Sequence, residues 1–197
     1  MLNTNPFRSF SSFLFYAGVI TAVTVGCLKL PDTLLLNEAP IAVVIPAPIH
    51  PVLPAPSRSQ LLAEAIAGKY SVSEGIALRA VLSAQKAEKD LKIPYYITLG
   101  MVAVESSFKE RAINSHDHGL MQVNSYYHRE LIEKMGGLPK MLNVETNIQT
   151  GTKIFSDYVV IAKGDAYKAL RIYNGRFKQN NYPDKVLKES AWIKSIT

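Results

Sequence analysis

The sequence predicts a mostly α-helical domain that follows an N-terminal hydrophobic segment and a proline-rich linker. Three observations support this fold class. Residues 9–28 carry no charged side chain, seven prolines fall between residues 31 and 56, and helix-forming residues with few strand signals follow residue 57. A chain of 197 residues with 48% hydrophobic residues is long enough for one compact domain with additional segments.

The N-terminal hydrophobic segment, within residues 1–30, has the length of either a signal peptide or a membrane anchor. Its uncharged run extends from Ser9 to Leu28, between Arg8 and Lys29. As a helix, this run would measure roughly 30 Å, which matches the hydrocarbon core of a bilayer. No Ala-x-Ala cleavage site follows the run, and this favours an uncleaved anchor over a cleaved export signal.

Cys27 leaves a third alternative open, in which the chain is a lipoprotein acylated at this cysteine. Lipoprotein boxes usually carry Leu three residues before the cysteine, but Thr24 occupies that position. The simpler interpretation is that Cys27 is one more apolar residue of the segment. All three alternatives place the rest of the chain outside the cytoplasm, in the periplasm or cell envelope.

Residues 31–57 form the predicted linker. Proline removes backbone donors and disfavours regular helix, so this segment is expected to be an extended, semi-rigid spacer. Such a spacer would hold a domain away from a membrane.

The remaining chain divides into predicted helices. Ser71 or Ser73 is a suitable N-cap for the second helix, in which Ile76, Ala80, Val81 and Leu82 are expected to lie toward one side. Pro94 is suited to the first turn of the third. The first predicted helix begins at residue 59 and ends near Gly68, and the others cover residues 71–93, 94–108, 126–135, 144–161, 165–173 and 182–189.

The charges indicate no nucleic-acid partner and no metal site. The net charge is +6, but the basic residues are dispersed and form no dense cluster. Such a balance suits anionic lipid or an acidic wall polymer equally well. His116 and His118, with His128 further on, lack additional spaced ligands, so the sequence predicts no metal and no cofactor.

Glu105 is the most informative charged residue, because it ends an apolar helix. Met101 and Val102 precede it by one helical turn, and Phe108 follows three residues later. Apolar neighbours remove water from a carboxyl group and raise its pKa, which suits a general acid. A solvated Glu at a helix end is the alternative for an arbitrary helix.

The surroundings of Glu105 favour the functional interpretation. The chain reads Glu-Ser-Ser-Phe at 105–108, Gly-Leu-Met-Gln-Val-Asn at 119–124, Asn-Ile-Gln-Thr-Gly at 147–151 and Tyr-Asn-Gly at 173–175. In this order, the four motifs resemble the soluble lytic transglycosylase family, whose catalytic domain has a goose-type lysozyme-like helical fold. The resemblance covers residues 90–190 approximately. It implies a lysozyme-like transglycosylase domain over residues 93–190, preceded by a helical N-terminal extension over residues 58–92.

The resemblance also implies roles for individual residues. The catalytic acid falls on Glu105, Ser106 supports it, and Gly119–Gln122 form the floor of the cleft. Asn147, Ile148 and Gly151 match a helix behind the cleft, Tyr182 and Val186 match a closing helix, and the hydroxyl of Tyr173 is expected close to the acid. The substrate-binding candidates are Ser106, Ser115, Met121, Gln122, Tyr173 and Asn174.

Two stretches depart from the family pattern and concern substrate contacts. Many members read Tyr-Asn-x-Gly, whereas here Gly175 follows Asn174 at once and Arg176 replaces the second glycine. The stretch Ser-His-Asp-His-Gly at 115–119 also differs from the common approach to the turn. Tyr126 and Tyr127 are candidates for stacking on sugars, although paired tyrosines at helix starts more often pack.

The resemblance implies cleavage of the β-1,4 bond between MurNAc and GlcNAc in peptidoglycan with formation of 1,6-anhydromuramyl products. One carboxylate suffices for this reaction, because the nucleophile is a hydroxyl of the same sugar. The expected partners are peptidoglycan strands, a membrane through the N-terminal segment, and machinery of the cell envelope.

Two alternatives stay open. Asp117 could orient a water, which would make the protein a hydrolytic muramidase, although an Asp before a turn more often stabilises its loop. The second alternative is a peptidoglycan-binding or assembly module without turnover, for which Arg176 and the altered stretch before Gly119 are the sequence support.

Overall fold

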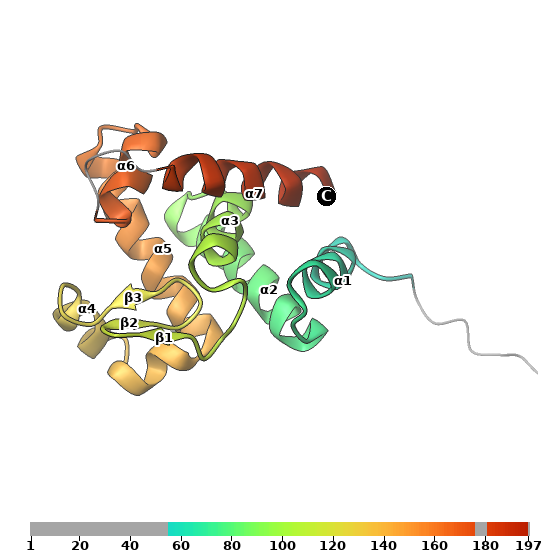
Figure 1. Cartoon of the computed structure of the whole chain (residues 1–197), viewed down its shortest axis with the longest axis horizontal. Helices are drawn as coiled ribbons and strands as arrows, with labels where there is room; N and C mark the ends of the chain where they lie inside the picture. The colour runs from blue at the N-terminus through green and yellow to red at the C-terminus, as the bar shows by residue number, and fades with distance from the viewer. Residues whose placement is uncertain (1–54, 176–180, 197) are drawn as a thin grey trace, which may run out of the picture. The chain divides into compact units, whose positions relative to one another are not determined.

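The computed structural model describes residues 55–175 and 181–196, and Figure 1 shows their arrangement. The signal peptide or anchor predicted at 1–30 and residues 31–54 of the linker lie outside these described residues. The helices are α1 (Arg58–Tyr70), α2 (Glu74–Leu91), α3 (Tyr95–Ser106), α4 (Arg129–Lys134), α5 (Val144–Ile161), α6 (Ala166–Tyr173) and α7 (Tyr182–Ile196), with a 3-10 helix η1 (Leu138–Leu142) before α5. The fold is mostly helical, as predicted.

Local capping explains where the first helices begin. Ser57 and Gln60 form a capping box at the start of α1, and Ser73 caps α2 by accepting from the amide of Ile76. Ser71, the alternative cap, instead ends α1 in a left-handed conformation. Pro94 immediately precedes α3, where its missing N–H leaves no helical bond unmade.

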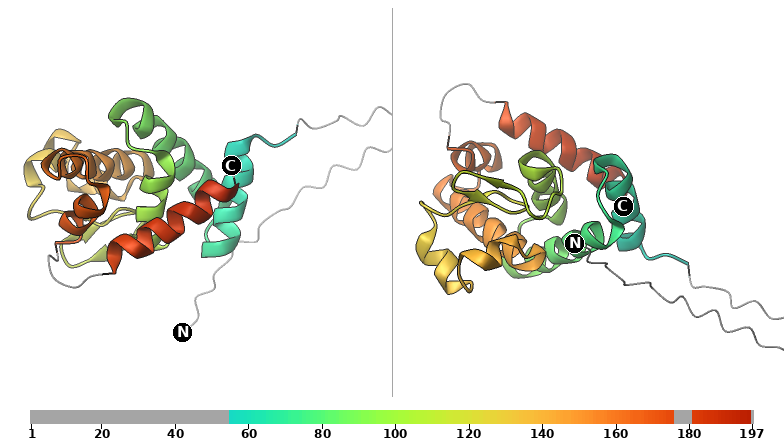
Figure 2. Two further views of the ribbon diagram at one scale, coloured as in Figure 1. Left: turned by 90° about the horizontal axis from the view of Figure 1, so that it is seen from above. Right: turned by 60° about the horizontal axis from the view of Figure 1, so that its bottom comes forward.

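Helix α3 is the central element of the domain. Residues 98–103 are all buried, so this helix is apolar on every side and is covered on every side. It packs against α2 and, along its length, against α7 (Figures 1 and 2). Gly100 permits this close approach, because a Cβ there would lie 2.2 Å from Ser190 Oγ and 2.8 Å from the carbonyl oxygen of Val186.

Helix α1 packs against α2 and the C-terminal part of α7. The hydroxyl of Tyr70 donates to Glu189 on α7, and Lys69 forms an ion pair with the same carboxylate. The Nζ atom of Lys69 also lies 3.7 Å from the centre of the Trp192 ring. These contacts connect the start of the described chain to its end (Figure 2).

The expected face of α2 is correct except at one position. Ala80 and Val81 are fully buried, whereas Leu82 is 50% exposed. Successive residues of a helix are separated by about 100°. With Ala80 and Val81 facing the core, Leu82 turns toward solvent.

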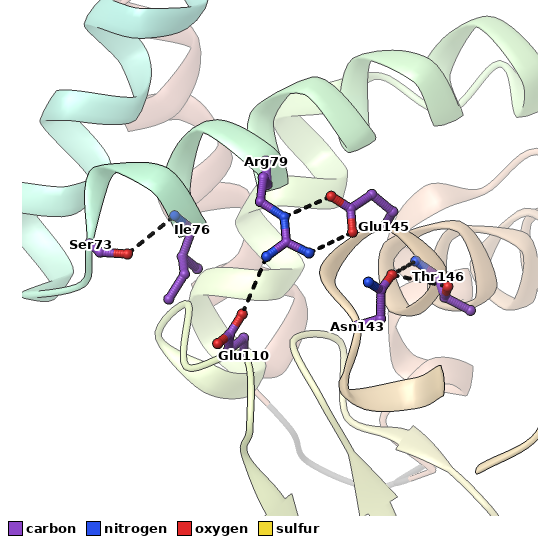
Figure 3. A network of polar contacts seen from close by, with 7 residues as sticks. All are labelled: Ser73, Ile76, Arg79, Glu110, Asn143, Glu145 and Thr146. Carbon is purple, nitrogen blue, oxygen red and sulfur yellow. Dashed lines mark hydrogen bonds and ion pairs between the residues drawn. The ribbon is translucent and has the colours of Figure 1, made fainter. Parts of the chain in front are cut away.

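An arginine–carboxylate network links α2 to the start of α5 (Figure 3). Arg79 donates from Nε and one terminal nitrogen to the two carboxylate oxygens of Glu145, at 2.8 and 2.7 Å, and its other terminal nitrogen lies 3.8 Å from Glu110. The hydrogen bonds from Arg79 are the main cause that lowers the pKa of Glu145 to about 2. The pair is largely exposed, so it contributes about 1 kcal/mol at most.

A small antiparallel sheet separates α3 from α4. Its strands are β1 (Ile113–Asn114), β2 (Asp117–His118) and β3 (Val123–Asn124), in the order β1–β2–β3. Asp117 pairs with Asn114 on one side and with Asn124 on the other. The sequence analysis did not predict this sheet or η1, placed the start of α4 at residue 126 rather than Arg129, and ended α7 at residue 189 rather than Ile196.

The close approach of α3 and α7 predicts a specific sensitivity. We expect Gly100→Ala to lower the free energy of unfolding by about 2 kcal/mol, because the added methyl group must displace backbone atoms of α7. Urea denaturation followed by circular dichroism measures this change.

Gly75→Ala is the matched control, because no atom lies within 4 Å of a Cβ at this position in α2. It should leave stability unchanged or raise it by up to about 1 kcal/mol. Equal effects of the two substitutions would contradict the importance of the α3–α7 contact.

Candidate functional site

Glu105 lies at the C-terminal end of α3 and faces a cavity of about 240 Å³. Met101 and Val102, one helical turn earlier, are fully buried, as the helical spacing predicted. Phe108 is fully buried as well, but it lies beyond the end of α3 at Ser106. The carboxyl group is partly buried and remains accessible from the cavity. The residues that line this cavity are Glu105, Asp117, Gln122, Val123, Asn124, Tyr127, His128, Ile154, Tyr158, Ile172, Tyr173, Asn174 and Gly175.

The pKa of Glu105 is raised from 4.5 to about 7, and burial is the largest cause. Two neighbours modify this effect in opposite directions. The hydroxyl of Tyr182 donates to Glu105 Oε1 at 2.6 Å and lowers the pKa, whereas the negative charge of Asp117 raises it. The carboxyl group is therefore poised between its protonated and ionised forms near neutral pH.

The floor of the cavity is the turn at residues 119–122, and one buried amide holds it. Asn147 on α5 accepts from the amide of Met121 at 2.7 Å. Its Nδ2 donates to the carbonyl oxygens of His118 and Met141, both at 2.8 Å. The side-chain oxygen and nitrogen of Asn147 thus both bond to backbone groups in the turn or beside it.

Side-chain hydroxyls from two further helices donate to carbonyl oxygens of the same turn. Ser106 on α3 donates through its hydroxyl to the carbonyl oxygen of Leu120 at 2.8 Å. Tyr173 on α6 donates to the carbonyl oxygen of Met121 at 2.8 Å. The turn next to Glu105 is therefore fixed by side chains from α3, α5 and α6.

Glycines allow the turn to approach its supports. Gly119 has φ +74°, and a Cβ there would lie 2.1 Å from the carbonyl oxygen of Met141. A Cβ on Gly151 of α5 would lie 2.6 Å from the sulfur of Met121. Larger residues at either position would push the turn away from α5.

The structure brings four of the candidate site residues together at the cavity: Glu105, Gln122, Tyr173 and Asn174. Ser106 and Met121 are buried beneath the cavity surface and do not line it. Ser115 is exposed in the turn between β1 and β2 and is not among the lining residues.

The sequence analysis did not single out Tyr182 as the tyrosine bonded to the acid. It expected the Tyr173 hydroxyl close to the acid, and this hydroxyl donates to the carbonyl oxygen of Met121. Tyr173 is nevertheless close enough to Glu105 for the carboxylate charge to contribute to raising its pKa, after burial. Tyr182 lies 77 positions from Glu105 in sequence, so only the packing of α7 on α3 shows that they meet.

Asp117 and His128 also line the cavity. The Asp117 carboxylate accepts from Asn124 Nδ2 at 2.7 Å across the β2–β3 pair. Burial lowers the pKa of His128, which favours its neutral form. Among residues 55–175 and 181–196, no group of three His, Cys, Asp or Glu side chains is arranged to hold a metal ion.

Comparison with known protein families identifies the domain. Residues 83–193, more than half of the chain, match the family described as "Transglycosylase SLT domain". The chain belongs to this family. No curated protein and no solved structure matches it.

Membership of the SLT family supports peptidoglycan lytic transglycosylase activity in general, with the glycan strands of peptidoglycan as substrate. Proteins with this domain act on the cell wall, outside the cytoplasm. None of the described helices has the length and apolar character required to cross a membrane. The hydrophobic run at residues 9–28 lies outside the part of the chain to which that finding applies.

Asn147→Ala tests the support of the SLT-domain turn. The substitution removes the side-chain partner of the buried Met121 amide and of the carbonyl groups of His118 and Met141, so we expect a loss of about 3 kcal/mol in the free energy of unfolding. Urea denaturation measures this loss, and turnover of peptidoglycan should fall at least tenfold in the remaining folded protein. Asn114→Ala, at an exposed position of β1, is the control, and comparable losses in both variants would contradict the assigned role.

The raised pKa of Glu105 predicts that the charged form destabilises the fold. Between pH 4.5 and about 7 the native state holds a proton that the unfolded chain releases, so stability falls as pH rises through this interval. Glu105→Gln should therefore be more stable than the natural protein above pH 7, by roughly 2–3 kcal/mol, and about equally stable below pH 4.5.

Thermal unfolding at pH 4 and pH 8 measures this difference. Glu64→Gln, on the exposed side of α1, controls for the change from carboxylate to amide. Equal stability of Glu105→Gln and the natural protein at pH 8 would show that burial does not disfavour the charge.

Proposed function

We propose that the protein is a lytic transglycosylase in which Glu105 acts first as the acid and then as the base. It cleaves the β-1,4 bond between MurNAc and GlcNAc and forms a 1,6-anhydromuramyl end. The observation that carries this proposal is a carboxyl group with a pKa of about 7 at the wall of a cavity in an SLT domain.

The two roles of Glu105 follow in one cycle. The protonated carboxyl group donates to the bridging oxygen as the bond from that oxygen to C1 of MurNAc breaks, and GlcNAc leaves with a new hydroxyl group. The 6-hydroxyl of the same MurNAc then bonds to C1 and transfers its proton to the Glu105 carboxylate. The reaction consumes no water, and the carboxyl group ends protonated, ready for the next bond.

The local environment supports both roles. Burial stabilises the neutral form needed for the first proton transfer, and the Tyr182 hydroxyl stabilises the ionised form needed for the second. A pKa near the working pH keeps both transfers accessible. Because the nucleophile belongs to the substrate, the site requires no second carboxylate to activate water.

The organisation of the chain follows from the same proposal. Residues 93–190 form the catalytic domain, and residues 58–92 form a helical extension that packs on it through α1 and α2. Residues 1–30 export the chain and anchor it at the cell envelope, and residues 31–57 are the spacer. The support for these two segments is the uncharged run and the proline content of the sequence.

Asp117 supports a second candidate function, a hydrolytic muramidase. It lines the same cavity as Glu105, and its charge contributes to raising the pKa of that residue. A second carboxylate so placed could orient a water for attack at C1. Its bond with Asn124 instead suggests that it stabilises the β2–β3 pair.

Product analysis distinguishes these functions. We expect purified peptidoglycan to release products that lack one water relative to hydrolysis products, as measured by mass spectrometry. Glu105→Gln should lower their rate of release by about 10²–10⁴-fold, because the proton donor is lost. Asp117→Asn should retain the anhydro products. Since the Asp117 charge raises the pKa of Glu105, its removal should move the alkaline limit of activity to lower pH.

Glu64→Gln is the control for these variants and should behave as the natural protein. Reducing-end products that disappear in Asp117→Asn would identify a muramidase. Binding to peptidoglycan without any released product would identify a non-catalytic module.

A further inference from the structure

A second, larger cavity adjoins the one that contains Glu105. Its volume is about 570 Å³, against about 240 Å³ for the Glu105 cavity. Tyr127, His128, Ile154 and Tyr158 line both cavities, so the two share a wall. We name the larger one the α4–α5 cavity, because most of its other lining residues belong to these two helices. They are Tyr126, which precedes α4, Arg129, Glu130, Leu131 and Lys134 of α4, and Asp157 of α5.

The α4–α5 cavity contains two cations without partners. Arg129 and Lys134 are exposed, and neither forms an ion pair or hydrogen bond through its side chain with another described residue. The acidic residue contributed by α5 differs in this respect, since Asp157 pairs with Lys153 at 2.6 Å. Glu130 is the remaining acidic residue of the lining. The cavity thus offers positive charge to a ligand.

Two exposed tyrosines are part of the lining of this cavity. Tyr126 and Tyr127 are 73% and 77% exposed, with ring centroids 5.1 Å apart in an edge-to-face arrangement. The two rings pack against each other and remain largely exposed, and the Tyr126 ring also lies 6.4 Å from that of His116. Exposed tyrosine rings provide rigid contact area for sugar or amide groups of a ligand.

Given the proposed function, we infer that the α4–α5 cavity binds the peptide that peptidoglycan carries on its muramyl sugars. Arg129 and Lys134 pair with carboxylates of this peptide while the attached sugar occupies the Glu105 cavity. The peptide starts from the sugar whose bond is cleaved, so the shared wall of Tyr127, His128, Ile154 and Tyr158 lies where sugar and peptide meet.

Charge and size favour a peptide over further sugar units. The glycan backbone is uncharged apart from its peptide substituents, so it offers no partner for two free cations. Ligand sites generally have volumes of about 300–1,000 Å³. The Glu105 cavity alone falls below this range, whereas the α4–α5 cavity lies within it.

Binding to a catalytically blocked protein tests the inference independently of turnover. In a Glu105→Gln background, isothermal titration calorimetry compares a soluble glycan fragment that bears its peptides with the same fragment after removal of the peptides by an amidase. We expect the peptide-bearing fragment to bind about tenfold more tightly at low salt. This preference should decrease as salt is added, because exposed charges are screened.

Arg129→Ala with Lys134→Ala should reduce the preference to less than twofold and leave the affinity for the peptide-free fragment unchanged. Arg58→Ala with Lys89→Ala removes the same two charge types from exposed positions of α1 and α2 and should retain the preference.

The outcomes separate this inference from the proposed function. Equal affinity for both fragments, or an equal loss for both when the cations are removed, would overturn the peptide assignment even if anhydro products are formed. A cation-dependent preference in a protein that releases no product would confirm the peptide site and overturn the proposed catalysis.

Discussion

The amide of Asn147 is the interaction on which the site depends. It lies in the core, yet it joins three backbone groups from three segments: Met121 in the turn, His118 in β2 and Met141 in η1. Burying the Asn147 amide without these hydrogen bonds would cost free energy, and so would burying the backbone groups without the amide. The Asn147 side chain and these backbone groups therefore hold each other in place, and this fixes the turn at 119–122 relative to α5.

That fixed turn controls the environment of Glu105. Helix α3 supplies both the Glu105 carboxyl group and the next residue, Ser106, whose hydroxyl donates to Leu120 in the turn. This bond couples the position of the acid to that of the cavity floor. Tyr182, the first residue of α7, donates to the carboxyl group and completes its environment. The pKa of about 7 thus depends on burial first and then on Tyr182 and Asp117, two residues that lie outside the helix that carries Glu105.

The sequence predicted those features that depend on local chemistry. Helix positions followed from caps such as Ser73 and from Pro94, and the burial of Met101 and Val102 next to Glu105 followed from helical spacing. Strands of two residues are too short for an alternating pattern, so the sheet left no comparable signal. The bond between Tyr182 and Glu105 spans 77 positions and depends on a glycine-mediated helix contact that no local pattern encodes.

The residues that follow α3 connect α1 to this arrangement. Ser107 and Phe108 both have positive φ, at 51° and 61°, which is unfavourable for side chains beyond glycine by about 1–3 kcal/mol each. The strain is offset because it turns Phe108 into the core, where its ring lies 5.0 Å from that of Tyr70 at the end of α1. Tyr70 is in turn held by Glu189 on α7, the same helix that supplies Tyr182. Helix α1 therefore stabilises the helix end that carries the acid, although it contributes no residue to the cavity lining.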